Sequence, residues 1–342
     1  MQVQGSLLIT GATGFVGRAL CSELRKRRRA FRAVVRSNKE SLVVSQDESP
    51  FPIEGLNVAT DWEGAFAGIT TIVHLAARVH VMNSTAAADL AAFRAVNVAG
   101  TLRLAEQAAA AGVRRFVFVS SVKVHGEANF KDSGGQSIPF IEDMPCMPVG
   151  AYGTSKWEAE QALRALAVRT GMELVILRPT LVYAPGVGAN FQRLIKLVES
   201  GLPLPLKSVK NRRSLVYVGN LVDVIIRGCD APIAAGEVFL VSDQEDQSTV
   251  ELITKIAQSL GSKARLVHVP VIVLKAIAKL VGRRAEAERI IGSLIVDSSK
   301  LCRLLKWSPP FSVAAGVAAT VAWHLAGAQV SPKQVCCPVV GE

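Results

Sequence analysis

This 342-residue chain is poor in aromatic residues, and its six cysteines show no CxxC spacing. Aromatic residues make up only 6% of the sequence, whereas nucleic-acid surfaces interleave aromatic and basic side chains. We therefore predict no nucleic-acid partner. Scattered cysteines form neither a zinc motif nor a disulfide framework. Reduced thiols in a cytoplasmic protein without a metal site are the simplest interpretation.

Apolar runs long enough to cross a membrane are also missing. The nearest candidate, 313–325, is short and alanine-rich, and we interpret it as a C-terminal helix packed on the body. The N-terminus has no signal-peptide pattern. Half of the residues are nevertheless apolar, so the chain can bury a sizeable core.

Acidic residues are in the minority, and the formal net charge is +11. An anionic membrane surface would suit this charge, but an anionic substrate such as a nucleotide-diphospho sugar suits it better. The densest basic run, 25–29, ends the first predicted helix, where cations complement the helix dipole. We interpret that run as a solvated face.

The first half of the chain alternates short apolar runs with helical patterns. We predict strands at 6–10, 31–36, 71–75, 115–120 and 173–178, and later at 215–218 and 237–241. This alternation predicts an α/β fold: a doubly wound parallel sheet (Rossmann) with a smaller C-terminal substrate-binding lobe. We assign 1–183, with return segments 214–242, to the dinucleotide-binding domain. The lobe would comprise 184–213 and 243–330, and 331–342 would be a tail.

Tyr152 and Lys156 carry the clearest chemical signal. A spacing of four places both side chains on one face of a helix. An ammonium beside a phenol stabilises the phenolate, so we expect the pKa of Tyr152 to fall toward neutrality. Such a tyrosine can exchange a proton with a sugar hydroxyl while hydride moves to a nicotinamide.

A glycine-rich turn near the N-terminus indicates where that cofactor binds. Gly11, Gly14 and Gly17 follow a predicted strand and open a helix, which is the context of a dinucleotide-binding turn. Thr13, Phe15 and Val16 complete the predicted contacts.

The residue at the end of the second strand bears on cofactor choice. An acidic residue there would bind the ribose 2′-hydroxyl of NAD, but this chain has Arg36. Arginine would pair with the 2′-phosphate of NADP, so we expect NADP, with NAD as the alternative.

Several motifs occur together in a fixed order: 11–17, 74–77, 97–101, 120–121, the Tyr152–Lys156 pair and 178–179. Together they resemble an extended short-chain dehydrogenase/reductase of the NAD-dependent epimerase/dehydratase family, over about residues 6–310. Segment 297–307 is similar to the final family signature. Within the family, the chain looks closest to bacterial enzymes of surface-polysaccharide synthesis that act on UDP-N-acetylhexosamines and their 4-keto derivatives.

The resemblance assigns roles residue by residue. Tyr152 would exchange the proton at the sugar 4-position, and Lys156 would also hold the nicotinamide ribose. Ser121 would bind the same sugar oxygen. Asn97 would lie near the site or serve a structural role. Four further residues would border the cofactor: Leu75, Ala76, Ala77 and Pro179.

The chain departs from the family pattern after Ser121. His125 stands where the family usually has tyrosine, and we interpret it as a packed histidine. Related 4,6-dehydratases carry an Asp-Glu or Asp-Lys pair where this chain has Val122 and Lys123, and without the acid dehydration is disfavoured. Lys123 faces either a substrate phosphate or acyl group, or solvent.

The resemblance also implies substrate contacts. Arg213 would clamp the diphosphate, Arg289 would be a second clamp, and Asn190 would begin the uridine site. The segment 78–82 would lie against the sugar ring.

These observations lead to a hypothesis with rivals. We expect an NADPH-dependent 4-reductase of a UDP-4-keto-6-deoxy-N-acetylhexosamine, and the alternative is a UDP-sugar 4-epimerase. A non-catalytic cofactor-binding module is disfavoured because Tyr152 and Lys156 are both present. The segment 271–284 combines an apolar face with basic residues, so it is either an ordinary helix of the lobe or a peripheral membrane contact. Family resemblance suggests a homodimer.

Overall fold

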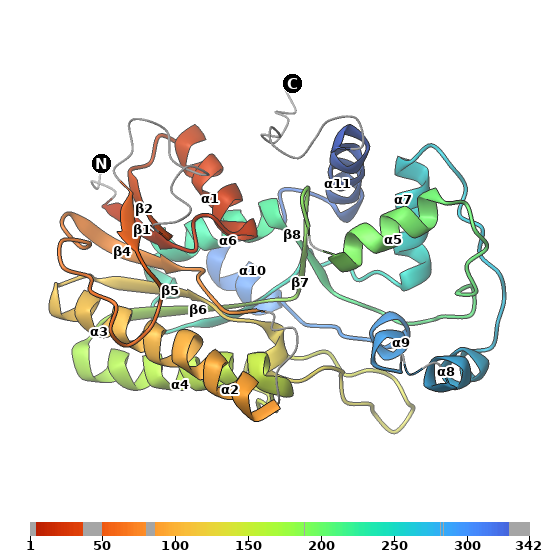
Figure 1. Ribbon diagram of the computed structural model, residues 1–342, viewed down its shortest axis with the longest axis horizontal. Helices are drawn as coiled ribbons and strands as arrows, with labels where there is room; N and C mark the ends of the chain where they lie inside the picture. The colour runs from red at the N-terminus through yellow and green to blue at the C-terminus, as the bar shows by residue number, and fades with distance from the viewer. Residues whose placement is uncertain are drawn as a thin grey trace.

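The computed structural model describes residues 5–36, 50–79, 86–187, 189–280, 282 and 284–327 (Figure 1). Its main element is a seven-stranded sheet in which every neighbouring pair is parallel. In spatial order the strands are β3 (Phe51–Ile53), β2 (Phe31–Arg36), β1 (Ser6–Thr10), β4 (Ile69–His74), β5 (Arg115–Val119), β6 (Glu173–Pro179) and β9 (Val238–Val241). The order reverses between β1 and β4, and ligands bind at such a switch point.

Helices cover both faces of this sheet because its central strands are apolar on both sides. On one face α1 (Phe15–Lys26), α6 (Val218–Asp230) and α10 (Ser299–Leu305) share an apolar cluster with the strands. On the other face lie α3 (Thr101–Ala110) and α4 (Gly150–Thr170). The helix α2 (Ala86–Arg94) contacts α4 and continues through the π-helical turn η2 (Ala95–Gly100) into α3.

A second, smaller group of elements lies beside the sheet's carboxyl edge (Figure 1). The two-stranded sheet of β7 (Leu181–Tyr183) and β8 (Leu215–Tyr217) packs with α5 (Ala189–Glu199), α7 (Thr249–Ser259) and α11 (Val313–Gly327) around a third apolar cluster. The remaining helices are α8 (Val271–Leu280), α9 (Arg284–Ile291) and the 3-10 turns η3 (Val122–Val124) and η4 (Pro232–Ala234).

The doubly wound sheet confirms the predicted fold class. The short strands β3 and β7 were not predicted, because three-residue runs carry little periodicity. Both β7 and β8 fall within the predicted dinucleotide-binding ranges, yet they pair with each other outside the large sheet. The predicted domain limits therefore stay a prediction.

The C-terminal helix predicted at 313–325 is confirmed as α11, which buries one face against the body. Among the described residues, no helix has both the length and the apolarity needed to span a bilayer. Within the same ranges, no group of three His, Cys, Asp or Glu side chains is arranged to hold a metal ion.

Candidate active site

The predicted catalytic residues meet at the carboxyl edge of the large sheet. Ser121 follows β5 and caps η3, where its Oγ accepts a hydrogen bond from the Lys123 backbone N–H at 3.2 Å. Tyr152 lies in the first turn of α4, and a side-chain hydrogen bond joins it to Ser121. Lys156 is buried one turn further along the same helix. The structure therefore brings the predicted trio together.

The electrostatics of Tyr152 differ from the expectation. Burial raises the pKa of Tyr152 to about 12, and the hydrogen bond to Ser121 opposes that rise. The predicted fall toward neutrality is therefore wrong for the protein's own groups. The physical reason is desolvation, which penalises the phenolate more than its neighbours stabilise it.

The same desolvation acts on Lys156. Its ammonium nitrogen lies 4.2 Å from the centre of the Phe118 ring, and burial lowers the pKa of Lys156 to about 7. Glu160, one turn on, opposes the fall. Lys156 is thus poised to gain or lose a proton near neutral pH.

A buried histidine near Lys156 connects three elements of the fold. His74, the last residue of β4, contacts the Thr10 hydroxyl through Nδ1 at 2.7 Å and the Thr101 hydroxyl through Nε2 at 2.9 Å. Burial, followed by the charge of Lys156, lowers the pKa of His74 to about 3. His74 is therefore a neutral link between β1, β4 and α3.

Asn97 ties the loop after β4 to the catalytic helix. Its Oδ1 accepts from the Arg78 N–H at 2.7 Å, and its Nδ2 donates to the Arg78 carbonyl at 3.1 Å and to Ser155 Oγ at 3.0 Å. The Ser155 hydroxyl in turn donates to the Tyr152 carbonyl at 2.9 Å. Asn97 lies in the π-helical turn, a distortion that often marks functional sites. Asn97 therefore holds the loop after β4 against α4, and a role in positioning the catalytic residues stays a prediction.

Sequence reasoning missed the buried ion pair behind Lys156. Arg178, at the end of β6, donates to Glu160 through Nε at 3.1 Å and through Nη2 at 2.6 Å. Its Nη1 contacts His125 Nε2 at 2.9 Å, and burial, then the Arg178 charge, lowers the pKa of His125 to about 4. His125 is buried and stacks on Phe140, as expected for a packed histidine. The spacing of four residues between Lys156 and Glu160 indicated that these two side chains share a helix face, but nothing local in the sequence paired Glu160 with Arg178.

The glycine turn has the geometry of a diphosphate cradle. Gly11 has a φ of +71°, and a Cβ there would lie 2.7 Å from the Ala76 backbone nitrogen. A Cβ on Gly17 would lie 2.1 Å from the Gly11 carbonyl oxygen. Gly14 caps α1 without a side-chain hydrogen bond, and the first turn of α1 has no acidic residue. The exposed backbone and bare helix N-terminus therefore fit a dinucleotide's phosphates.

The other predicted cofactor contacts lie around this turn. Thr13 belongs to the turn, whereas Phe15 and Val16 begin α1 and pack against the sheet core. The Leu75 N–H donates to the Thr10 carbonyl at 3.2 Å, which holds the segment after β4 against the turn.

Three further residues follow strand ends. Ala77 continues the segment after β4, and Pro179 is buried at the end of β6. Arg36 is exposed at the end of β2, and the loop after it lies outside the described residues. A role of Arg36 in cofactor choice stays a prediction.

Lys123 borders an open pocket beside Tyr152. Its Nζ forms an ion pair with Glu127 at 2.6 Å, and both side chains are partly exposed. Lys123 therefore faces a carboxylate of the protein, and its contact with a substrate phosphate or acyl group stays a prediction. The pocket has a volume of about 260 Å³ and is lined by Val79, Asp89, Phe93, Lys123, Glu127, Val149, Gly150, Ala151 and Tyr152.

The predicted diphosphate contact, Arg213, lies in a tightly held segment. Its backbone pairs with Gln247, and its Nη1 donates to the Gly292 carbonyl at 3.3 Å. The structure does not place Arg213 in the pocket beside Tyr152. Asn190 and Arg289 lie in α5 and α9, but their side chains are outside the described part of the chain. All three substrate contacts stay predictions.

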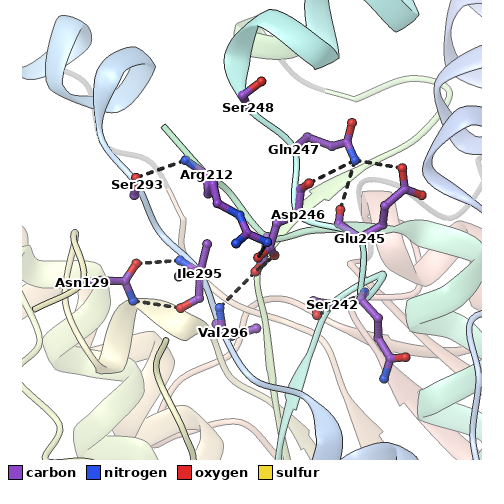
Figure 2. A network of polar contacts seen from close by, with 12 residues as sticks. Asn129, Arg212, Ser242, Glu245, Asp246, Gln247, Ser248, Ser293, Ile295 and Val296 are labelled. Atoms are coloured by element: carbon purple, nitrogen blue, oxygen red, sulfur yellow. Dashed lines mark hydrogen bonds and ion pairs between the residues drawn. The ribbon is translucent and has the colours of Figure 1, made fainter. Parts of the chain in front are cut away.

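Figure 2 shows how this segment is fixed to its surroundings. Asn129 exchanges two hydrogen bonds with the backbone of Ile295, and the Ser293 hydroxyl accepts from the Arg212 N–H at 3.1 Å. The Arg212 guanidinium pairs with Asp246. The loop after β5, the segment around 212 and the chain after α9 therefore form one polar network.

Comparisons with known proteins agree with this geometry. Residues 7–242 match the NAD dependent epimerase/dehydratase family. The chain belongs to this family. It is 42% identical, over 91% of its length and 93% of the relative's, to a UDP-glucose 4-epimerase of Vibrio cholerae.

Two further comparisons are informative. The chain is 28% identical to the N-acetyl-alpha-D-glucosaminyl-diphospho-ditrans,octacis-undecaprenol 4-epimerase of Escherichia coli O157:H7, over 78% of this chain and 75% of that protein. The structure of UDP-glucuronic acid 4-epimerase from Bacillus cereus in complex with NAD superposes with a TM-score of 0.72 at 23% identity. That match covers 93% of this chain and 98% of that one. The chain is thus an enzyme of the extended short-chain dehydrogenase/reductase type, as the sequence motifs predicted.

Proposed function

We propose that this protein is a UDP-sugar 4-epimerase that uses NAD. The supporting observation is the Ser121–Tyr152–Lys156 arrangement in a chain 42% identical to a UDP-glucose 4-epimerase over nearly its whole length. This was the alternative hypothesis from the sequence. The favoured one, an NADPH-dependent 4-reductase, depended on Arg36 and finds no support among these relatives.

The residues present suit reversible oxidation at the sugar 4-carbon. NAD, when bound at the glycine turn, supplies the acceptor and returning donor of hydride. With its own proton lost, Tyr152 is a phenolate that takes the proton from the sugar 4-hydroxyl, becomes the neutral phenol, and later gives that proton back. Ser121 holds the same oxygen, and Lys156 holds a positive charge beside Tyr152 while it is a phenolate.

The substrate contacts follow the predicted division of the chain. We infer that the nucleotide diphosphate lies toward the lobe, where Arg213, Arg289 and Asn190 would contact it. The sugar would then occupy the pocket beside Tyr152, with Lys123 and Glu127 at its mouth. We also propose a homodimer and a cytoplasmic location, and the epimerase activity depends on neither.

The test is interconversion without net redox change. Purified protein should convert UDP-glucose to UDP-galactose, or UDP-N-acetylglucosamine to UDP-N-acetylgalactosamine, with NAD far below the sugar concentration. Anion-exchange chromatography should show the same final ratio of the two UDP-sugars, whichever member of the pair is supplied at the start. The Tyr152→Phe variant, checked for an unchanged melting temperature, should lose the activity. Stoichiometric oxidation of NADPH by a UDP-4-keto-6-deoxy sugar, without interconversion of either pair, would contradict the proposal.

A further inference from the structure

The helix α8 differs from the other long helices because none of its residues is buried. Its sequence, VIVLKAIAKL, is nevertheless among the most apolar stretches of the chain. Ile272 is 82% exposed, Leu280 is 87% exposed, and Ile277 is 52% exposed. An apolar stretch this exposed in a folded protein indicates an interaction surface. Of the two alternatives from the sequence, an ordinary helix of the lobe does not explain this exposure.

The exposed apolar residues form one continuous stripe. They recur at three- and four-residue spacing, so they lie on a single face of the helix. The partly covered residues Val271, Leu274 and Ala278 lie on the opposite side, toward the protein. The outward stripe consists of Ile272, Val273, Ala276, Ile277 and Leu280.

Two lysines flank this stripe. Lys275 and Lys279 are both exposed and are spaced four residues apart, between the inner and outer faces. Long lysine side chains can keep their charge in water while the apolar face beside them is buried. An apolar stripe bordered by basic residues is typical of a helix that lies in a membrane interface, and here both lysines lie along one edge of the stripe.

The chain on either side of α8 is rich in basic residues, although α9, which packs against α8, carries Glu286 and Glu288. From position 252 to 285 the sequence contains seven Lys or Arg and no Asp or Glu. Lys263 and Arg265 are exposed just before α8, and the Lys207 N–H donates to the Val267 carbonyl at 3.2 Å, which places a second basic loop alongside. Val267 is itself 46% exposed. Basic side chains near an anionic leaflet each contribute about 1 kcal/mol of attraction.

The position of α8 leaves it accessible. In Figure 1 it lies beside α9 at the outer edge of the molecule, away from the large sheet. We propose that α8 and the basic loops beside it form a docking surface for an anionic lipid bilayer. Burial of the apolar stripe in the interface would supply the binding energy, and the basic residues would select anionic lipid over neutral lipid. This inference does not depend on which sugar the site accepts.

Co-sedimentation of the full-length protein with vesicles tests the proposal. Vesicles of equal parts phosphatidylglycerol and phosphatidylcholine should pellet the wild type, and vesicles of phosphatidylcholine alone should not. Raising the salt from ~0.05 M to ~0.5 M should weaken binding, because the charges are exposed and screened. The double variant Ile272→Ser, Leu280→Ser should reduce the partition constant about tenfold or more.

A matched control distinguishes binding through α8 from nonspecific adsorption of the protein to vesicles. Val168 is 88% exposed on α4, so Val168→Ser removes a comparable exposed apolar side chain elsewhere and should leave vesicle binding unchanged. The Lys275→Gln, Lys279→Gln variant should reduce binding to anionic vesicles, whereas Lys131→Gln should not. All of these side chains are exposed, so melting temperatures should match the wild type.

Three results would overturn the proposal. The first is wild-type protein that stays in the supernatant with anionic vesicles, which would leave an acidic protein as the partner. The second is undiminished binding by the Ile272→Ser, Leu280→Ser variant. The third is a wild-type oligomer, measured without lipid by analytical ultracentrifugation, that dissociates in that variant. In that case the stripe is an interface between copies of this chain.

Discussion

Replacing Lys156 by methionine should abolish activity and yet stabilise the folded protein near neutral pH. The ammonium is buried against Phe118, and burial lowers its pKa from 10.5 to about 7. At about 1.4 kcal/mol per pKa unit, holding that charge in the folded state costs about 5 kcal/mol. Its attraction to the Phe118 ring offsets about 1–2 kcal/mol of this cost. We therefore expect Lys156→Met to raise the free energy of unfolding by about 2–4 kcal/mol at pH 7.

The sign of the pH dependence follows from the direction of the shift. Below pH 7 the lysine is charged in both the folded and the unfolded state, so its full cost is present. Between pH 7 and 10.5 the unfolded chain binds more protons than the folded one, so wild-type stability rises with pH relative to the variant. Above pH 10.5 the lysine is neutral in both states, and only the difference in packing remains.

Urea unfolding of both proteins, freed of bound nucleotide, measures this difference at pH values from 6 to 10. The difference between the two curves isolates Lys156, because all other titrating groups are shared. The control Lys131→Met replaces an exposed lysine instead of a buried one and should not reproduce the gain in stability at pH 7. If Lys156→Met is less stable than wild type at pH 7, and the difference is flat with pH, the burial argument is refuted.

Three further predictions concern the residues that hold the site. Gly17→Ala places a Cβ 2.1 Å from backbone and should abolish nucleotide binding in calorimetry, whereas Gly228→Ala, which meets only ordinary contacts, should bind normally. Asn97→Leu removes three hydrogen bonds and should lower kcat far more than it raises KM; an unchanged kcat would contradict its positioning role. Glu160→Gln leaves the buried Arg178 without its counter-charge and should cost about 3–5 kcal/mol in urea unfolding. A loss below 1 kcal/mol would show that this pair is hydrated.

The large sheet was predictable except for β3. Each of its other strands is a nearly continuous apolar run of a few residues bounded by turn residues. The run 31–36 became β2 and 115–120 became β5, to within one residue. The glycine turn was predictable for the same local reason: its spacing and its position after β1 lie in one stretch of sequence. The strand β7 was not predicted, because the three residues Leu181–Tyr183 are too few to show a strand's periodicity.

In the site, too, the features set by local spacing were predictable, and those set by distant packing were not. Tyr152 and Lys156 are neighbours on one helix, so local spacing was enough to pair them. Their pKa values depend on burial by elements distant in the sequence, and the direction for Tyr152 was therefore predicted wrongly. The pairing of Glu160 with Arg178 needs the packing of α4 against β6, which no local pattern encodes.

The pKa of Tyr152 is raised and that of Lys156 is lowered, and both shifts have the same cause, which is burial. Burial makes a lone phenolate at Tyr152 unfavourable, and it makes a lone ammonium at Lys156 unfavourable as well. Glu160 cannot fully compensate the lysine, because Arg178 already donates to both of its carboxylate oxygens. A phenolate formed on Tyr152 would itself supply the missing counter-charge to Lys156, so the two desolvation costs are relieved together. The proton of Tyr152 is therefore easiest to release when Lys156 is charged, and Lys156 is easiest to charge when that proton leaves. Activity at Tyr152 should depend on the pair rather than on either residue alone.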